Sequence, residues 1–117
     1  MPVVTLLTPL TDRLVLDMAL RSLVSGLSGA LDCPPEDVWA HHVRMDEVRQ
    51  GDADVAASGW CPVVLVRGRA RSEHAVGHAL AAAASGVSQA LGVPLEDVWV
   101  QWVDVQPGRA FAGGEIL

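Results

Sequence analysis

The sequence repeats itself at a fixed offset of 60 residues, without a gap. Pro2-Val3-Val4 matches Pro62-Val63-Val64, and Glu36-Asp37-Val38-Trp39 matches Glu96-Asp97-Val98-Trp99. Shorter identities between these two pairs keep the same offset. Self-similarity at a fixed offset is the signature of a repeated structural unit. We therefore expect two copies of one unit, over about residues 2–45 and 62–105, joined by a linker over 46–61.

Each copy shows the same order of local signals. A short β-branched run opens it, at Val3 to Leu7 and at Val63 to Val66, and predicts a strand. An N-cap residue, Asp12 or Ser72, precedes about twenty residues with apolar positions at helical spacing. A second strand is expected over about 38–45 and 98–105. The acidic, glycine-containing linker predicts a loop that can include one turn of helix.

A β-α-β unit has parallel strands joined by a right-handed crossover, with its helix on one face. Two such units predict an α+β fold in which tandem β-α-β units form a four-stranded mixed sheet with two helices on one face. We expect this fold to form one domain over residues 1–117. The other face would expose Val, Trp and Leu side chains, and oligomerisation is the simplest way to cover it. Trp39, Trp99 and Trp102 are accordingly expected in the core or at an interface.

Composition limits the class of function. The 117 residues carry a net charge of −6, which argues against a nucleic acid partner. No apolar run reaches the roughly 18 residues that span a bilayer, and no signal peptide is evident, so we expect no membrane partner. Cys33 and Cys61 do not form a disulfide framework, and we expect free thiols in the cytoplasm.

The chain contains eight cationic side chains, all of them Arg. Amine chemistry would therefore have to come from the chain terminus. Removal of Met1 would leave Pro2 as a secondary amine, and burial and nearby cations would lower its pKa below the ordinary value of about 7.7 to 8.0. Such an amine is a candidate general base. Pro62 is an internal amide without basicity, and the plainer alternative for Pro2 is a proline that begins an edge strand.

Arg67, Arg69 and Arg71 alternate at the end of the predicted third strand, so in extended backbone all three would point to one face. Guanidinium groups bind carboxylates in bidentate fashion, which makes this cluster a candidate anion site. The alternative is a set of surface charges that offset an acidic protein.

The sequence contains two histidine pairs that are candidate metal ligands. His41 and His42 are adjacent on a predicted strand and face opposite sides. His74 and His78 are four residues apart on the second helix, without an evident third ligand. We expect neither a metal nor another cofactor.

Several segments together resemble the tautomerase superfamily, and most closely its malonate semialdehyde decarboxylase group. They are Met1-Pro2, Pro34-Pro35-Glu36-Asp37, Arg67-Gly68-Arg69-Ala70-Arg71, Pro94-Leu95-Glu96-Asp97-Val98-Trp99 and Phe111-Ala112-Gly113-Gly114-Glu115. The resemblance covers almost the whole chain. The C-terminal segment departs from that group, because it is shorter and lacks a tryptophan before the phenylalanine.

The resemblance implies roles for individual residues. Pro2 and Asp37 would be catalytic, and Arg67 and Arg69 would bind the substrate. Arg109 would be a second carboxylate ligand that can reach a neighbouring chain, and Phe111 an apolar lid. The assembly would be a homotrimer.

The expected reaction is a keto-enol proton transfer on a small enol or 2-keto carboxylate. One alternative is a lyase or hydratase similar to malonate semialdehyde decarboxylase, in which a cationic Pro2 acts as an acid. Another is a family member that has lost activity and binds a ligand. A different class is a non-catalytic ferredoxin-like ligand-binding domain.

Overall fold

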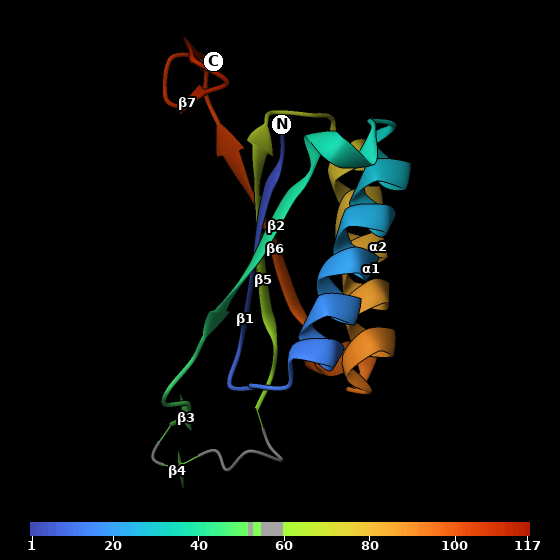
Figure 1. Ribbon diagram of the computed structural model, residues 1–117, viewed down its shortest axis with the longest axis vertical. Helices are drawn as coiled ribbons and strands as arrows, with labels where there is room; N and C mark the ends of the chain where they lie inside the picture. The colour runs from blue at the N-terminus through green and yellow to red at the C-terminus, as the bar shows by residue number, and fades with distance from the viewer. Residues whose placement is uncertain (52, 55–59) are drawn as a thin grey trace.

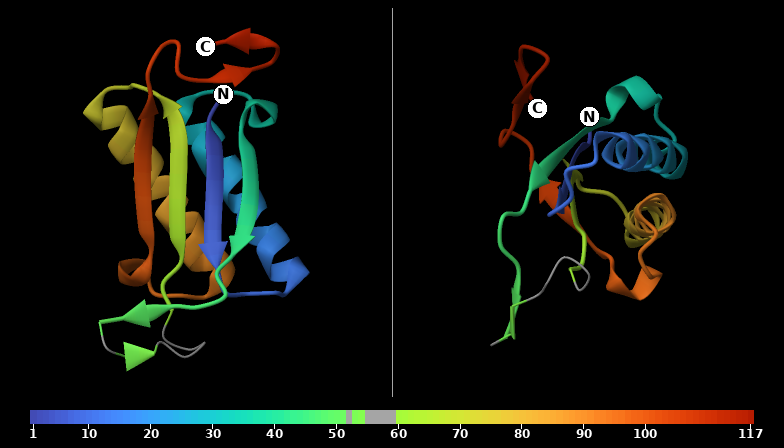
Figure 2. Two further views of the ribbon diagram at one scale, coloured as in Figure 1. Left: turned by 90° about the vertical axis from the view of Figure 1, so that its left-hand side faces the viewer. Right: turned by 60° about the horizontal axis from the view of Figure 1, so that its bottom comes forward.

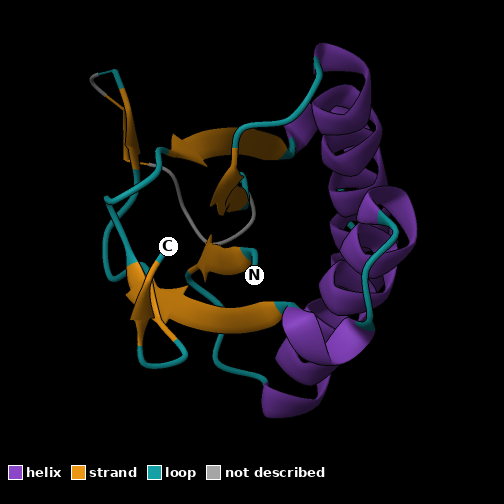
Figure 3. Cartoon of the chain, turned by 90° about the horizontal axis from the view of Figure 1, so that it is seen from above, coloured by secondary structure: helices purple, strands orange, loops and turns teal. Residues whose placement is uncertain are grey.

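The computed structural model describes residues 1–51, 53–54 and 60–117. Two long helices cover one face of a four-stranded sheet (Figure 1, Figure 3). The first copy consists of β1 (Val3–Thr8), α1 (Arg13–Leu31), the short 3-10 helix η1 (Pro35–Asp37) and β2 (Trp39–Arg44). The second copy consists of β5 (Val63–Arg69), α2 (Glu73–Leu91), η2 (Leu95–Asp97) and β6 (Trp99–Val105). The two copies therefore have the same elements in the same order, as the repeat predicts.

Two short hairpins lie outside the repeat. In the predicted linker, β3 (Arg49–Gln50) pairs with β4 (Ala53–Asp54), where we expected a loop or a helical turn. Residues 52 and 55–59 of that linker lie outside the described residues. At the C-terminus, β7 (Phe111–Ala112) pairs with β8 (Glu115–Ile116), a hairpin that no sequence signal predicted.

The strand order is β2-β1-β5-β6 (Figure 2). β1 is parallel to β2, β5 is parallel to β6, and the two inner strands β1 and β5 are antiparallel. The predicted mixed sheet is thus confirmed. Both β-α-β units join adjacent strands, which differs from the split unit of a ferredoxin-like domain. Thr5 pairs with Leu65, its equivalent in the other copy, so a local two-fold axis passes between them.

The predicted helix starts are confirmed. The Asp12 carboxylate accepts hydrogen bonds from the backbone N–H groups of Leu14 and Val15, and the Ser72 hydroxyl accepts one from Ala75. The helices pack against one another at equivalent glycines. A Cβ on Gly26 would lie 3.3 Å from the Ala82 carbonyl oxygen, so the two backbones approach closely there.

The core lies between the helices and the helix side of the inner strands. Its fully buried members come from both copies and include Val4, Leu6, Leu23, Leu27, Val64, Val66, Ala79, Ala83 and Val87. The short side chains on α2 allow that helix to lie close to the sheet and to α1.

By length and composition alone α1 could cross a membrane, since it has 19 residues with a mean hydropathy of 1.4. The sequence expectation that no apolar stretch was long enough had not identified this property. Its buried residues Ala19, Leu23, Leu27 and Leu31 belong to the core, so packing against the sheet accounts for the apolar face.

No helix of the described residues covers the opposite face of the sheet. The exposed apolar side chains on this open face are Trp39, Val43, Trp99 and Val103. Trp39 and Trp99 occupy equivalent positions on the two outer strands and are 62% and 61% exposed. The prediction of an uncovered apolar face is confirmed, and Trp102, on the helix side, packs against the core.

Candidate active site

Pro2 is buried at the start of an inner strand. Its carbonyl oxygen accepts a hydrogen bond from the Trp39 backbone N–H at 3.0 Å, which ties the chain start to the beginning of β2. Because β1 lies between β2 and β5, the alternative of a proline that begins an edge strand is wrong. The Pro2 nitrogen is thus placed at one end of the sheet, between two neighbouring strands.

The register of β1 and β5 brings two predicted arginines to this end. Val3 pairs with Arg67, and the same antiparallel register places Gly68 opposite Pro2. Arg67 and Arg69 are both exposed, on the open side of β5, so the prediction that they share a face is confirmed. The antiparallel pairing therefore joins residues far apart in the sequence.

Arg71 does not continue this arginine row. β5 ends at Arg69, and Arg71 lies in the turn that leads to the Ser72 N-cap of α2. The alternating pattern thus gave a wrong orientation for the third arginine. Arg71 is half-buried, and its Nε is a buried donor with no acceptor in the described part of the chain. Its positive charge lies beside the start of α2, where the helix dipole is also positive.

Asp37 is the last residue of η1 and is exposed. Its backbone N–H donates to the Pro34 carbonyl at 3.0 Å, and Asp97 makes the same bond to Pro94 in the second copy. The acidic residue therefore closes the same turn before the second strand in both copies. Only Asp37 lies at the Pro2 end, because the strand that follows it begins at the Trp39–Pro2 hydrogen bond.

Arg109 and Phe111 lie in the C-terminal segment, at the same end of the sheet as the N-terminus (Figure 2). The Arg109 backbone N–H donates to the Gln106 carbonyl in a turn, and Phe111 pairs with Ile116 in the short hairpin. Phe111 is 72% exposed. It therefore does not form a closed lid within a single chain.

Two open grooves lie on the helix side and do not include Pro2. One, of about 500 Å³, runs between α1 and α2, and the other, of about 400 Å³, runs between α1 and β2. None of the predicted site residues lines either groove. Neither of these two grooves therefore includes the predicted site.

His41 and His42 face opposite sides of the sheet, as the sequence predicted. His41 shares a hydrogen bond with Thr5 on the open face, and His42 shares one with Thr8 on the helix side, each at 2.9 Å. His74 and His78 are exposed, with ring centroids 6.5 Å apart. Within the described ranges, no three His, Cys, Asp or Glu side chains are placed to share a metal ion.

One group beside Pro2 was missed by the sequence reasoning. Gly68 pairs with Asp104 on β6, and the Trp102 indole Nε1–H donates to the Asp104 carboxylate at 3.0 Å. A Cβ on Gly68 would lie 2.8 Å from Cζ2 of Trp102, so the indole occupies the space above this glycine. A glycine inside a strand, between two arginines, was the available signal.

The equivalent end around Pro62 has a different chemistry. The Pro62 carbonyl accepts a hydrogen bond from Trp99, also at 3.0 Å, so the backbone arrangement is the same. The two positions equivalent to the exposed arginines are Leu7 and Pro9.

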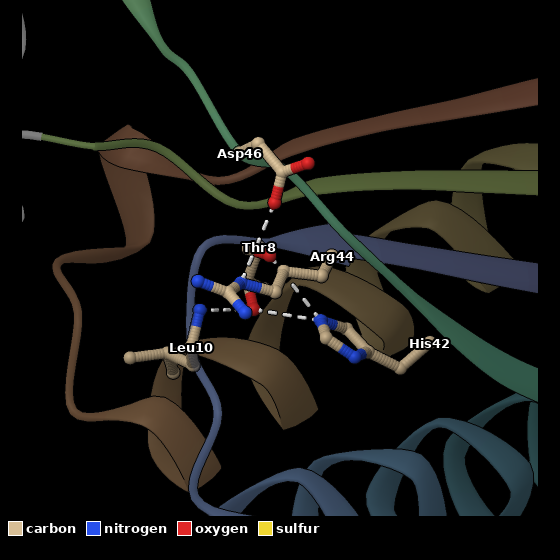
Figure 4. Close-up of polar contacts among 5 residues, drawn as sticks. All are labelled: Thr8, Leu10, His42, Arg44 and Asp46. Carbon is tan, nitrogen blue, oxygen red and sulfur yellow. Dashed lines mark hydrogen bonds and ion pairs between the residues drawn. The ribbon is translucent and has the colours of Figure 1, made fainter.

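At the Pro62 end the residue equivalent to Gly68 is Thr8, which has the side chain that glycine lacks (Figure 4). Thr8 is buried, bonds to His42 and accepts a hydrogen bond from the Leu10 N–H, while Arg44 pairs with Asp46. The Pro2 end thus has the two exposed arginines Arg67 and Arg69, and the Pro62 end has no arginines at the equivalent positions.

Comparison with solved structures identifies the fold. A native fused 4-OT matches with a TM-score of 0.87 and 17% identity, over 97% of this chain and 94% of that one. Macrophage migration inhibitory factor from Toxoplasma gondii matches with a TM-score of 0.81 and 16% identity, over 98% of this chain and 99% of that one. Pt0534 inactivated by 2-oxo-3-pentynoate matches with a TM-score of 0.73 and 17% identity, over 97% and 95%.

Further fused 4-OT structures that match are symmetric and asymmetric trimers. Neither a protein-family model nor a curated protein matches the sequence. The likeness is therefore one of architecture, and a specific relation to the malonate semialdehyde decarboxylase group is not part of it. The chain has the fold of the tautomerase superfamily, which its sequence resembles.

Proposed function

We propose that the chain is an N-terminal-proline tautomerase that moves a proton on a small enol or 2-keto carboxylate. The observation that carries the proposal is the antiparallel register of β1 and β5, which brings Arg67 and Arg69 to the end of the sheet at which Pro2 lies. Removal of Met1 would turn the Pro2 nitrogen into a free secondary amine at that point.

In this mechanism the neutral amine accepts the proton of the enol hydroxyl, and the resulting ammonium donates a proton to carbon. The enol O–H bond breaks and a C–H bond forms, while the C=C bond becomes single and the C–O bond becomes the carbonyl, so the amine returns to its neutral form. The substrate carboxylate is held by the exposed guanidinium groups of Arg67 and Arg69. Their charges, with that of Arg71, disfavour the ammonium form and keep the amine available as a base near neutral pH. Asp37, Arg109 and Phe111 are assigned to the same end of the sheet.

The proposal includes a homotrimer in the cytoplasm. In the single chain Trp39 and Trp99 are exposed on the uncovered face of the sheet. Two further copies would cover that face and would bring C-terminal hairpins near neighbouring sites. The trimers reported for fused 4-OT structures support this part of the proposal.

The test combines intact-mass spectrometry with a reactive 2-keto acid. Since 2-oxo-3-pentynoate inactivates Pt0534, we expect it to add covalently to the Pro2 amine of this protein. A single adduct on the N-terminal peptide, with Met1 absent, is the expected result. Retention of Met1 would exclude an amine at Pro2 and with it the mechanism.

The matched variants are Pro2→Ala and Pro62→Ala, assayed on a panel of enol and β-keto acids. Loss of the positioned base should lower kcat/KM by about 10²- to 10⁴-fold in the Pro2 variant. The Pro62 variant should keep its activity, because Pro62 is an internal amide in an equivalent backbone setting. Turnover of β-keto acids with release of CO2, and none of enols, would favour the decarboxylase alternative.

A further inference from the structure

We infer that Trp102 forms an apolar wall that keeps water from the Pro2 amine, and that Asp104 is the positioning residue that holds this wall in place. The inference rests on the proposed function, in which Pro2 is a free amine. It adds two residues on β6 that neither the sequence nor the resemblance assigned to the site.

Three residues form a row across the helix side of the sheet at its Pro2 end. Pro2, Gly68 and Asp104 lie on three neighbouring strands in this order, with Gly68 paired to Asp104. Neighbouring strands are about 4.8 Å apart. The space above Gly68 is therefore next to the Pro2 ring, which is buried on the same side of the sheet.

The Trp102 indole fills the space above Gly68. Gly68 is buried but has no side chain, and the Trp102 indole lies where its Cβ would be, with Cζ2 2.8 Å from that position. The indole reaches over from β6, and its body packs against the core. A large apolar ring thus borders Pro2, and any residue larger than glycine at position 68 would displace it.

A hydrogen bond to Asp104 fixes the Trp102 ring. The indole Nε1–H donates to Asp104 Oδ1 at 3.0 Å, and both residues lie on the helix side of β6. Without this acceptor, the Nε1–H would have to bond to water and the ring could turn away from Gly68. Asp104 is exposed, so its own charge is screened by solvent at the Pro2 nitrogen.

The first copy of the repeat has different residues at the three equivalent positions. The residues equivalent to Gly68, Trp102 and Asp104 are Thr8, His42 and Arg44. Thr8 and His42 form a polar contact at 2.9 Å (Figure 4), so the position beside Pro62 is occupied by hydrogen-bonding groups. The indole wall is found at the end of the sheet that has the exposed arginine pair, and not at its equivalent.

The experiment measures the pKa of the Pro2 amine directly, by 15N NMR titration of protein labelled at its seven prolines. Internal prolines are tertiary amides, so only a free Pro2 titrates. An apolar wall disfavours the ammonium form, so its loss should raise the pKa. We expect a rise of about 0.5 to 1 unit for Asp104→Ala and at least as much for Trp102→Ala. Circular dichroism checks that each variant is folded.

Asp104→Asn is the matched control, because its amide oxygen can still accept the indole hydrogen bond without the charge. The pKa should then remain near the wild-type value. A fall in both Asp104 variants would mean that only the carboxylate charge acts on the amine, and no change in the alanine variants would mean that the wall has no effect; either result overturns the inference. If no amine titrates in the wild type, the proposed function itself is wrong.

Discussion

Replacing Arg67 by alanine tests whether the end of β5 binds a carboxylate. Arg67 is exposed, one residue from the position opposite Pro2, and it has no ion pair with an acidic residue in the part of the chain that the structure describes. Its guanidinium is therefore free to meet an anion. A hydrogen bond to a charged group contributes about 1.5 to 3 kcal/mol, and exposure places this one near the lower value. Since about 1.4 kcal/mol is tenfold, we expect KM to rise about 10- to 30-fold.

The assay compares a carboxylate substrate with its methyl ester in steady-state kinetics. The Arg67 variant should show the rise in KM for the acid and little change in KM for the ester. Any fall in kcat from a raised pKa of the Pro2 amine should be the same for both substrates. Arg13→Ala is the control, since Arg13 is an exposed arginine at the first turn of α1, at the other end of the sheet. Equal rises in KM for acid and ester, or the same rise in the Arg13 variant, would refute a carboxylate contact at Arg67.

Two further predictions concern packing and assembly. Gly77→Ala should stabilise the protein by about 1 kcal/mol, or about 3 to 6 °C in Tm, because nothing lies within 4 Å of a new Cβ on this helix. Gly86→Ala should gain less or lose stability, since its Cβ would lie 3.3 Å from Ser22 on α1; equal gains in calorimetry at one protein concentration would contradict the close helix contact. Replacing both Trp39 and Trp99 by alanine should convert a trimer into smaller species in sedimentation velocity, and a trimer that survives this change would show that the open face does not hold it together.

Much of the fold could be predicted because the signals were local and occurred twice. Asp12 and Ser72 are N-cap residues at equivalent positions, and both accept the expected backbone hydrogen bonds. A strand of β-branched residues precedes each cap, and a proline follows each helix. Such features depend only on neighbouring residues, and the repeat made each one a check on the other.

The errors in the site have a different cause. Arg71 was placed on the face of Arg67 and Arg69 because the alternating pattern continues beyond the strand, whereas the chain turns before Ser72 to start α2. The contact of Trp102 with Gly68 could not be predicted in the same way. It depends on the register between two strands and on the direction in which one indole leans, and neither is encoded in the residues of one segment.

The two ends of the sheet explain why a duplicated chain would have one chemical site. The carbonyl oxygens of Pro2 and Pro62 accept equivalent hydrogen bonds, both at 3.0 Å, so the two prolines have the same backbone arrangement. A proline nitrogen is basic only at a chain terminus, and no change of side chains can make Pro62 an amine. The residues around Pro62 are therefore under no requirement to bind an anion. The positions at which the two copies differ, with Arg67 and Arg69 at one end and Leu7 and Pro9 at the other, consequently locate the site better than the prolines themselves, which are shared.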